Sequence, residues 1–432
     1  MSFTHARVVE VSAWQRSVGA VTLDPSTNLY AFEYSSGWRR DGVELAPLHM
    51  ARRSGVFEFP ELARSSFYGL PALLADALPD RFGNALVTAW LAEQGIDPSE
   101  ITALDRLAYA SARTMGALTF APPTGPLTGD VDMVDVSQLV SAARSAIDGN
   151  LLTSAAHESL RQLISVGSTA GGARAKAVVA YNPTSGAMRS GQLDAPDGFE
   201  QWLLKLDGVG DPASQVDPLV SSQQYCRVEF AYYLMATQAG IEMSPSFLLL
   251  EGPRAHFMTK RFDRGANNER IHLASLCALA HLDFNMARTH SYSSYFLTAA
   301  SLGLNSSDRE EIFRRIAFNV FGVNHDDHTK NASFLLPQFS PWELSPAYDV
   351  THANWGGEWS AQHQMSVNGK FRDITLDDLR HLGDLHNVPD IEKILLDVHV
   401  AIDGWPDFAV RAGVDGATTK RVGADLLEHR PT

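Results

Sequence analysis

The stretch NHDDHTKN, residues 324–331, brings two histidines, two aspartates, a lysine and two asparagines close together. Asp326 and Asn331 have the spacing of a protein-kinase catalytic loop, with four residues between them. In such a loop the Asp accepts the proton of the substrate hydroxyl and the Asn binds Mg²⁺, while a later Asp binds the metal beside the phosphates. Asp349, in the stretch AYDV, is in place for that third role. Asp327 is one residue too close to Asn331, so Asp326 is the expected base.

Two other interpretations of this loop stay open at this point. His325, Asp326, Asp327 and His328 could ligate a transition metal in a hydrolase, although four consecutive residues rarely converge on one ion. The loop could also be a solvated turn without a catalytic role, whose Asp and Asn side chains form hydrogen bonds with their own backbone. The loop alone does not separate these interpretations from a kinase site.

Three upstream features supply further parts of a kinase. The stretch GSTAGGARAK, residues 167–176, departs from the Walker pattern but can form a glycine-rich turn whose N–H groups face phosphates, with a hairpin turn as the alternative. Lys205 lies on an apolar predicted strand, where a kinase lysine binds phosphates and pairs with a helix glutamate. Glu229, on the next predicted helix among apolar neighbours, needs such a partner. These parts stand in the order of a kinase chain, which favours the kinase interpretation.

The surrounding elements are predicted from hydrophobic periodicity. Residues 1 to about 60 alternate apolar and polar and predict short antiparallel strands. Two more strands are predicted around Gly252 and Pro253, and the chain after about residue 270 is expected to be mostly helical. Ser307 and Glu310 predict a capping box for the helix before the catalytic loop. Further helices are predicted over 68–96, 133–164 and 221–239.

Composition narrows the class of protein. The formal net charge of −15 argues against a chain that grips nucleic acid by itself, but it allows a basic partner. Cys226 and Cys277 lack zinc-ligand spacing and fit a reducing cytosol. The N-terminus has no signal-peptide pattern, and no run of 18 apolar residues occurs, so a cytoplasmic protein without a membrane span is expected.

With these residues together, the chain resembles the HipA family, the serine/threonine kinase toxins of bacterial toxin–antitoxin modules, over nearly its whole length. GLPALLADALPDRFGNAL looks like the family's N-terminal signature, GGARAK like its phosphate loop, KRFDR like the segment joining its lobes, and NHDDHTKN with AYDV like its catalytic and metal loops. The resemblance implies an α+β, protein-kinase-like two-lobed fold. Its parts would be an N-terminal β-rich subdomain packed on the small lobe (1–125), the small lobe with the glycine-rich loop (126–262) and a mostly helical C-terminal lobe (263–432).

The resemblance also implies a role for each matching residue. Asp326 would be the general base, and Asn331 and Asp349 would bind Mg²⁺. ATP would contact Gly171, Gly172, Ala173, Arg174, Lys176, Lys205, Glu229, Lys260, Arg261, Phe262, His328, Lys330, Asn331 and Tyr348, with 260–262 meeting adenine through backbone groups. Family kinases autophosphorylate a serine in the glycine-rich loop; the matching position here is Thr169, with Ser168 beside it.

Family members bind a small helix-turn-helix antitoxin, HipB, which brings the complex to operator DNA and represses its transcription. Their known substrates are aminoacyl-tRNA synthetases, notably glutamyl-tRNA synthetase, whose inhibition stops translation and promotes persistence. The resemblance implies similar partners for this chain. A small-molecule phosphotransferase of the aminoglycoside type is the alternative enzyme, because DDHTKN also fits its D-x-H-x-x-N loop, although Asn324 replaces the usual His. A non-catalytic co-repressor is the alternative from another class.

Overall fold

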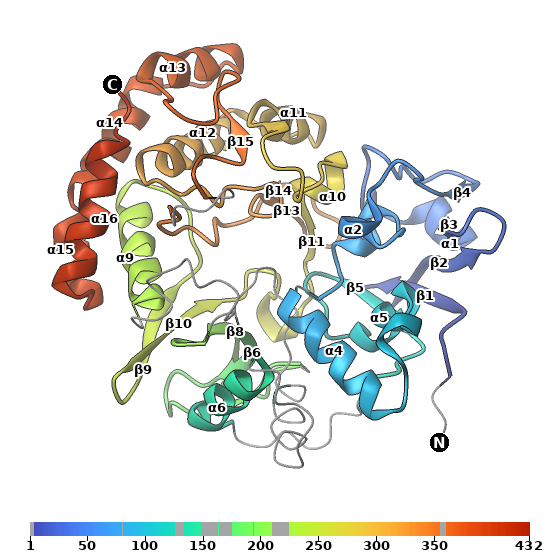
Figure 1. Cartoon of the computed structure of the whole chain (residues 1–432). Coiled ribbons are helices and arrows are strands. Elements are labelled where there is room, and N and C mark those ends of the chain that lie inside the picture. Colours follow the sequence, from blue (N-terminus) through green and yellow to red (C-terminus); the bar gives the residue numbers. More distant parts are fainter. Residues whose placement is uncertain are drawn as a thin grey trace. The chain divides into compact units, whose positions relative to one another are not determined.

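The computed structural model describes residues 4–79, 81–125, 134–147, 163, 175–192, 194–209, 224–354 and 360–432 (Figure 1). The chain forms two compact units, each assembled from three segments. Unit 1 contains Met1–Ala213, Met258–Ala274 and Leu335–Ser340, and unit 2 contains Ser214–Phe257, Ser275–Phe334 and Pro341–Thr432. The domain boundaries expected from the sequence, at 125 and 262, stay a prediction.

A five-stranded sheet with the order β4-β3-β2-β1-β5 opens unit 1. The alternation read from the sequence has its physical cause here, since Val9, Val11 and Ala13 of β1 are buried while the residues between them face outward. Trp14 and Gln15 both have positive φ, as a two-residue hairpin turn between β1 and β2 requires. The strands are β1 (Val8–Ala13), β2 (Arg16–Asp24), β3 (Leu29–Tyr34), β4 (Val56–Phe57) and β5 (Leu118–Ala121). The predicted N-terminal strands are therefore confirmed.

The helices of unit 1 are short. Leu73, Leu74 and Leu78 are buried, but the stretch predicted as helical over 68–96 contains two separate helices, 72–75 and 81–93, and Leu78 lies between them. The predicted helix over 133–164 is confirmed as far as residue 147, and most of its remainder lies outside the described residues. The helices are α1 (Ser36–Asp41), α2 (Arg64–Phe67), α3 (Ala72–Ala75), α4 (Arg81–Glu93), α5 (Ala103–Ala110), α6 (Val136–Ile147) and the 3₁₀ turns Pro98–Glu100 and Ala266–Asn268.

A second five-stranded sheet has the order β7-β6-β8-β10-β9. The division between the units falls within β10, after Phe257. Gly252 has a positive φ in the turn between β9 and β10, so the predicted strand pair is confirmed. The strands are β6 (Lys176–Tyr181), β7 (Met188–Ser190), β8 (Glu200–Lys205), β9 (Ser246–Glu251) and β10 (Arg254–Lys260).

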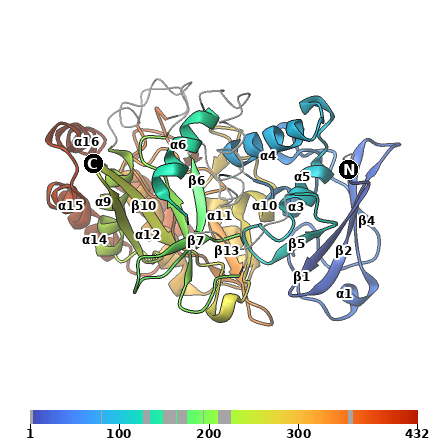
Figure 2. The same cartoon turned by 90° about the horizontal axis from the view of Figure 1, so that it is seen from below.

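Unit 2 is mostly helical, as predicted for the chain after residue 270. Helix α9 lies against α14 and α15 in both views (Figures 1 and 2). The helices are α9 (Tyr225–Gln238), α10 (Leu276–Ala280), α11 (Ser293–Ser301), α12 (Ser306–Phe321), α13 (Leu376–Leu385), α14 (Ile391–Asp403), α15 (Trp405–Ala412) and α16 (Gly416–Glu428). Five short strands remain, of which β11 lies mostly in unit 1 and β13 is divided between the units. They are β11 (His272–Ser275), β12 (His290–Ser291), β13 (Ser333–Leu336), β14 (Glu343–Leu344) and β15 (Met365–Ser366).

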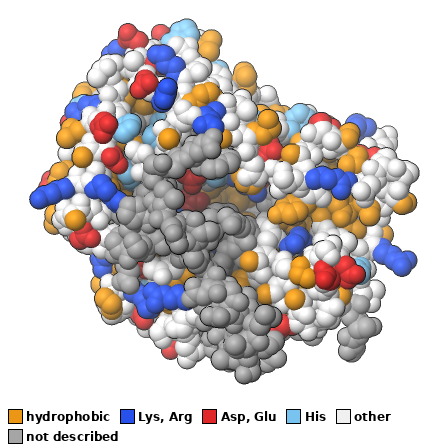
Figure 3. All heavy atoms as spheres, viewed as in Figure 1, with side chains coloured by type: hydrophobic (Ala, Val, Ile, Leu, Met, Phe, Trp, Pro, Cys, Tyr) orange, Lys and Arg blue, Asp and Glu red, His pale blue; other side chains and the backbone are white. Residues whose placement is uncertain are grey.

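The surface and the helix lengths bear on the class of protein. On the face drawn in Figure 3, Lys and Arg side chains are scattered singly or in small groups. Within the described ranges, no helix combines the length and the apolar character that crossing a bilayer requires.

Candidate active site

Helix α12 delivers the loop 324–331 in unit 2. Ile312, Phe313 and Ile316 are fully buried and fix the helix in the core. The predicted capping box at Ser307 and Glu310 is wrong, because the helix begins at Ser306. Its cap is Asn305, whose side chain accepts from the Ser307 N–H at 2.8 Å. Asp308 closes the box by accepting from the Asn305 N–H at 2.7 Å. Asn and Asp are about as favourable as Ser at the N-cap of a helix, so the sequence pattern alone did not identify the cap.

The two adjacent aspartates of the loop have opposite surroundings. The Asp326 side chain is 66% exposed, so a substrate hydroxyl can reach it. The Asp327 side chain is completely buried. Asn331 donates its side-chain N–H to the Asp326 carbonyl at 2.8 Å, a bond of the kind expected for a self-closing turn. The oxygen of that amide is the atom that a cation would take.

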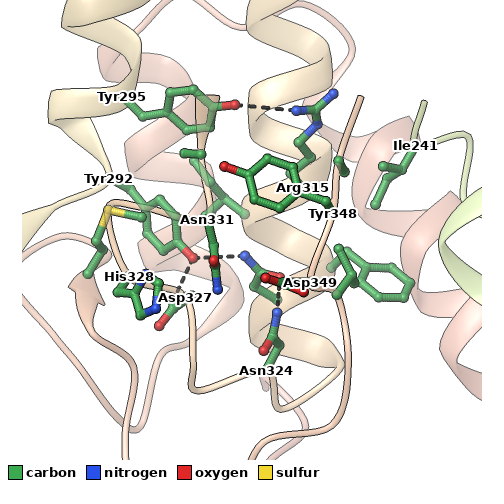
Figure 4. Close-up of a pocket in the computed structure, with 17 residues that line it drawn as sticks. Ile241, Tyr292, Tyr295, Arg315, Asn324, Asp327, His328, Asn331, Tyr348 and Asp349 are labelled. Atoms are coloured by element: carbon green, nitrogen blue, oxygen red, sulfur yellow. Dashed lines mark hydrogen bonds between the residues drawn. The ribbon is translucent and has the colours of Figure 1, made fainter. Parts of the chain in front are cut away.

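Asn331 and Asp349 line one pocket, drawn in Figure 4. Asp349 has a φ of +52°, a left-handed conformation that is uncommon outside glycine and occurs often at functional sites. Tyr348 ties the metal-loop segment to the catalytic loop, because its hydroxyl donates to the Lys330 carbonyl at 2.6 Å and bonds Ser333. Amide and carboxylate oxygens are the donors that Mg²⁺ prefers, so these two side chains fit a magnesium ion.

The hydrolase interpretation finds no support in the described part of the chain. There, no three His, Cys, Asp or Glu side chains form a group that could hold a metal ion. His325 and Asp327 are buried, whereas Asp326 faces solvent. Alternating burial along the loop therefore keeps these consecutive side chains from converging on one ion.

His328 and Lys330 flank the exposed aspartate. The His328 Nε2 atom lies 3.8 Å from a carboxylate oxygen of Asp326. Phe284 supports both residues, since its ring centroid is 5.8 Å from that of His328 and 4.5 Å from the Lys330 ammonium. A cation over an aromatic face is held electrostatically.

Several polar residues of the pocket received no role in the kinase interpretation of the sequence. Arg315 and Asn319 lie four residues apart on α12, on one face of the helix and within its mainly apolar stretch 312–321, which is the signal that could have found them. Tyr292 and Tyr295 come from the start of α11, and no local pattern in the sequence links them to the loop. Tyr295, Arg315, Tyr292, Asn324 and Asp327 are labelled in Figure 4.

The predicted phosphate-binding lysines lie in unit 1. Lys176 of β6 and Lys205 of β8 are direct partners in the antiparallel ladder, and both are buried. Directly opposed residues project to the same face of a sheet, so the two side chains are neighbours. Glu229 is buried on α9 in unit 2, and its pairing with Lys205 stays a prediction.

The expected adenine segment, 260–262, also belongs to unit 1. Lys260 pairs with Glu200 at 2.8 Å, and the Arg261 N–H donates to the Gln201 carbonyl at 2.9 Å. The Arg261 guanidinium and that of Arg264 each lie 2.7 Å from the buried Asp263 carboxylate. Burial would raise the pKa of Asp263, but these two cations outweigh it and lower the pKa well below its usual range. The Arg261 side chain therefore has a structural partner, and its proposed contact with ATP rests on the backbone.

The remaining predicted site residues, Ser168, Thr169, Gly171, Gly172, Ala173 and Arg174, lie outside the described residues.

Comparison with known proteins now bears on this geometry. The family model for the HipA-like C-terminal domain matches residues 168–405, and the one for the HipA N-terminal domain matches residues 9–121. The chain belongs to the HipA family. The resemblance seen in the sequence is confirmed, and the HipA match covers both the catalytic-loop and the metal-loop residues.

A solved HipA structure has the same fold as this family member. It is HipA of Shewanella oneidensis in complex with HipB and operator DNA, with a TM-score of 0.69, 16% identity and coverage of 98% of this chain and 96% of that one. The expected α+β, kinase-like fold is thereby confirmed. A candidate kinase of Sinorhizobium fredii is 31% identical over 218 residues, which are 45% of this chain. The aligned part spans about half (48%) of that relative's length.

Proposed function

We propose that this HipA-family protein is an ATP- and Mg²⁺-dependent protein serine/threonine kinase. The observation that carries the proposal is that Asp326 and Asn331, in the loop after α12, have different surroundings. Its exposed Asp326 can meet a hydroxyl, while Asn331 shares a pocket with Asp349. The S. fredii candidate kinase adds support for phosphotransfer as the general chemistry.

The proposed reaction assigns one task to each group. Asp326 orients the acceptor hydroxyl and takes its proton as the phosphoryl group transfers. Asn331 and Asp349 hold Mg²⁺, which when bound shields the charge on the phosphates. Lys205 and Lys176 add positive charge for the α- and β-phosphates, and Glu229 keeps Lys205 in place. His328, Lys330 and Tyr348 line the site. Most of the rate enhancement comes from positioning and electrostatics.

The finer proposals concern partners and regulation. The Shewanella HipA crystallised with HipB and operator DNA, which supports a HipB-like helix-turn-helix antitoxin for this chain. With a net charge of −15, the chain would reach DNA mainly through that basic partner and repress transcription with it. We further propose an aminoacyl-tRNA synthetase as the acceptor, action as a cytoplasmic toxin that promotes persistence, and autophosphorylation at Thr169 or Ser168. A phosphate on that loop would repel those of ATP.

The variant Asp326→Asn tests the proposal. Removing the base should lower phosphotransfer from labelled Mg·ATP by about 10²- to 10⁴-fold, while nucleotide affinity measured by calorimetry stays within about twofold of wild type. Asp373→Asn is the matched control, because that aspartate is 92% exposed and lies in the same unit. Candidate synthetases, aminoglycosides and buffer alone serve as acceptors. Wild-type turnover by Asp326→Asn would overturn the assignment, and transfer to aminoglycosides alone would favour the small-molecule enzyme.

A further inference from the structure

Asp327 is held by three hydrogen-bond donors in the core of unit 2. The Tyr292 hydroxyl donates to one carboxylate oxygen at 2.6 Å, and His363 Nδ1 lies 2.8 Å from the same atom. The Gln364 backbone N–H donates to the other oxygen at 2.6 Å. A buried carboxylate is costly unless it is fully hydrogen-bonded, so this number of short bonds holds the side chain in one position.

The protonation states agree with this arrangement. Burial would raise the pKa of Asp327, but the His363 ring and the three hydrogen bonds outweigh it and lower the pKa. Burial and the neighbouring Asp327 raise the pKa of Tyr292 well above its ordinary value, so its hydroxyl remains a donor. Asp327, called the anchor below, is thus an ionised carboxylate that accepts hydrogen bonds from three donors.

The segment 360–364 holds the loop on both sides of Asp326. Gln364 donates its side-chain N–H to the His325 carbonyl at 3.3 Å and its backbone N–H to Asp327. The His325 ring bonds the Ser360 carbonyl through Nδ1 at 2.7 Å. The residues immediately before and after Asp326 are therefore both bonded to the same segment, whose Ser360 and Gln364 are buried, while the Asp326 side chain itself faces solvent.

A chain of side chains connects this anchor to the end of α12. Asn324 donates to the Asn319 side-chain oxygen at 3.0 Å, and Asn319 donates to the Tyr292 hydroxyl at 3.0 Å. Figure 4 draws these hydrogen bonds as dashed lines at the labelled Tyr292 and Asn324 side chains. Tyr292 thereby joins the start of the loop to Asp327, three residues further along.

We propose that Asp327 is a positioning residue of the phosphotransfer site, with Tyr292 and His363 as its partners. It fixes the backbone of Asp326 so that the exposed carboxylate meets the acceptor hydroxyl in one geometry. This inference rests on the proposed function, since it assigns Asp327 a part in that reaction. A displacement of about 1 Å at a reacting group can cost on the order of 10²-fold in rate, so the anchor acts on turnover without touching substrate.

Two variants test the anchor in the full-length protein. Asp327→Asn keeps the shape but removes the charge and one acceptor, and we expect kcat to fall about 100-fold. Tyr292→Phe removes one donor and should lower kcat about tenfold. In both, KM for Mg·ATP should stay within about twofold, because the metal and phosphate ligands remain. Amide hydrogen exchange over 324–331 should become faster than in wild type.

Tyr34→Phe is the matched control. Tyr34 is buried in unit 1 and its hydroxyl donates to the Met50 carbonyl at 2.7 Å, so the variant loses one buried tyrosine bond, whereas Tyr292→Phe loses the bonds to Asp327 and Asn319. Tyr34→Phe should retain wild-type kcat and loop exchange at a similar loss of thermal stability. We expect Tyr292→Phe to fold even if Asp327→Asn does not, because it removes a single oxygen atom from a side chain that keeps its packing.

The outcomes separate the anchor from the reaction. Equal kcat and equal loop exchange in wild type and Tyr292→Phe would overturn the positioning role. A loss of kcat in Tyr34→Phe as large as that in Tyr292→Phe would overturn it too, because a general loss of stability then explains both. Wild type without any phosphotransfer would refute the proposed function instead, while faster loop exchange in the variants would still show that Asp327 holds the loop.

Discussion

Asp326 and Asp327 have the same side chain and differ in surroundings, which gives them different chemistry. The exposed Asp326 can exchange a proton with a bound hydroxyl, whereas both carboxylate oxygens of Asp327 accept hydrogen bonds from buried donors. Kinase-loop spacing from Asn331 selects Asp326, and burial independently makes the same choice. The agreement of these two arguments is the strongest support for Asp326 as the base.

Two buried histidines predict how stability depends on pH. Burial lowers the pKa of His272 to about 4, and burial, with the His363 ring, also lowers that of His325 to about 4. The unfolded chain binds these protons at a pKa near 6.5, so the free energy of unfolding falls as pH drops from about 6.5 to about 4. For His272 alone this loss is about 3 kcal/mol.

Urea unfolding at pH 7 and pH 4.5 measures this dependence. His272→Gln should make the free energy of unfolding depend less steeply on pH, because no group with a lowered pKa remains at that position. The exposed His381 provides the control, and His381→Gln should keep the wild-type dependence. An unchanged pH dependence in His272→Gln would contradict the account.

At the scale of elements, the entry into the catalytic loop depends on how α12 begins and ends. Its cap is Asn305, and its last turn leads through Gly322 to the loop. Asn305→Ala should lower the free energy of unfolding by about 1 kcal/mol, because it leaves N–H groups of the first turn without their acceptor. Ser307→Ala, at the residue that the sequence suggested as the cap, should change it by less than about 0.5 kcal/mol. Thermal or urea unfolding of both variants measures the difference. A larger loss of unfolding free energy in Ser307→Ala than in Asn305→Ala would indicate that Ser307 is the cap.

Much of the element structure could be predicted because it depends on local periodicity. The alternation of apolar and polar residues in β1 and the helical spacing of apolar residues in α12 can both be read from residues that are close together in the sequence. The catalytic spacing from Asp326 to Asn331 is local too. The bond from Tyr292 to Asp327 joins residues 35 positions apart, and no pattern around either one indicates the other. The same holds for the ladder that places Lys176 opposite Lys205, since register depends on tertiary pairing.

At the scale of the whole molecule, the residues that we propose to act on the nucleotide are divided between the two units. Lys176 and Lys205 lie in unit 1, and Asp326, Asn331 and Asp349 lie in unit 2. In a kinase, a strand lysine binds the phosphates, while the catalytic loop and a later Asp supply the base and the metal ligands. The acidic net charge of −15 agrees with the proposal that a basic partner would make the DNA contacts.

The binding of Mn²⁺, as a paramagnetic substitute for Mg²⁺, tests the central claim most directly. Electron paramagnetic resonance should find ATP-dependent Mn²⁺ binding in wild type and in the control Asp373→Asn. Asp349→Asn tolerates the left-handed backbone but loses the charge. Asp349→Asn and Asn331→Ala, as single variants, should each weaken Mn²⁺ binding roughly tenfold or more. Lys205→Ala should lower ATP affinity in the same assay. Wild-type binding in all three variants would contradict a single nucleotide–metal centre built from these residues.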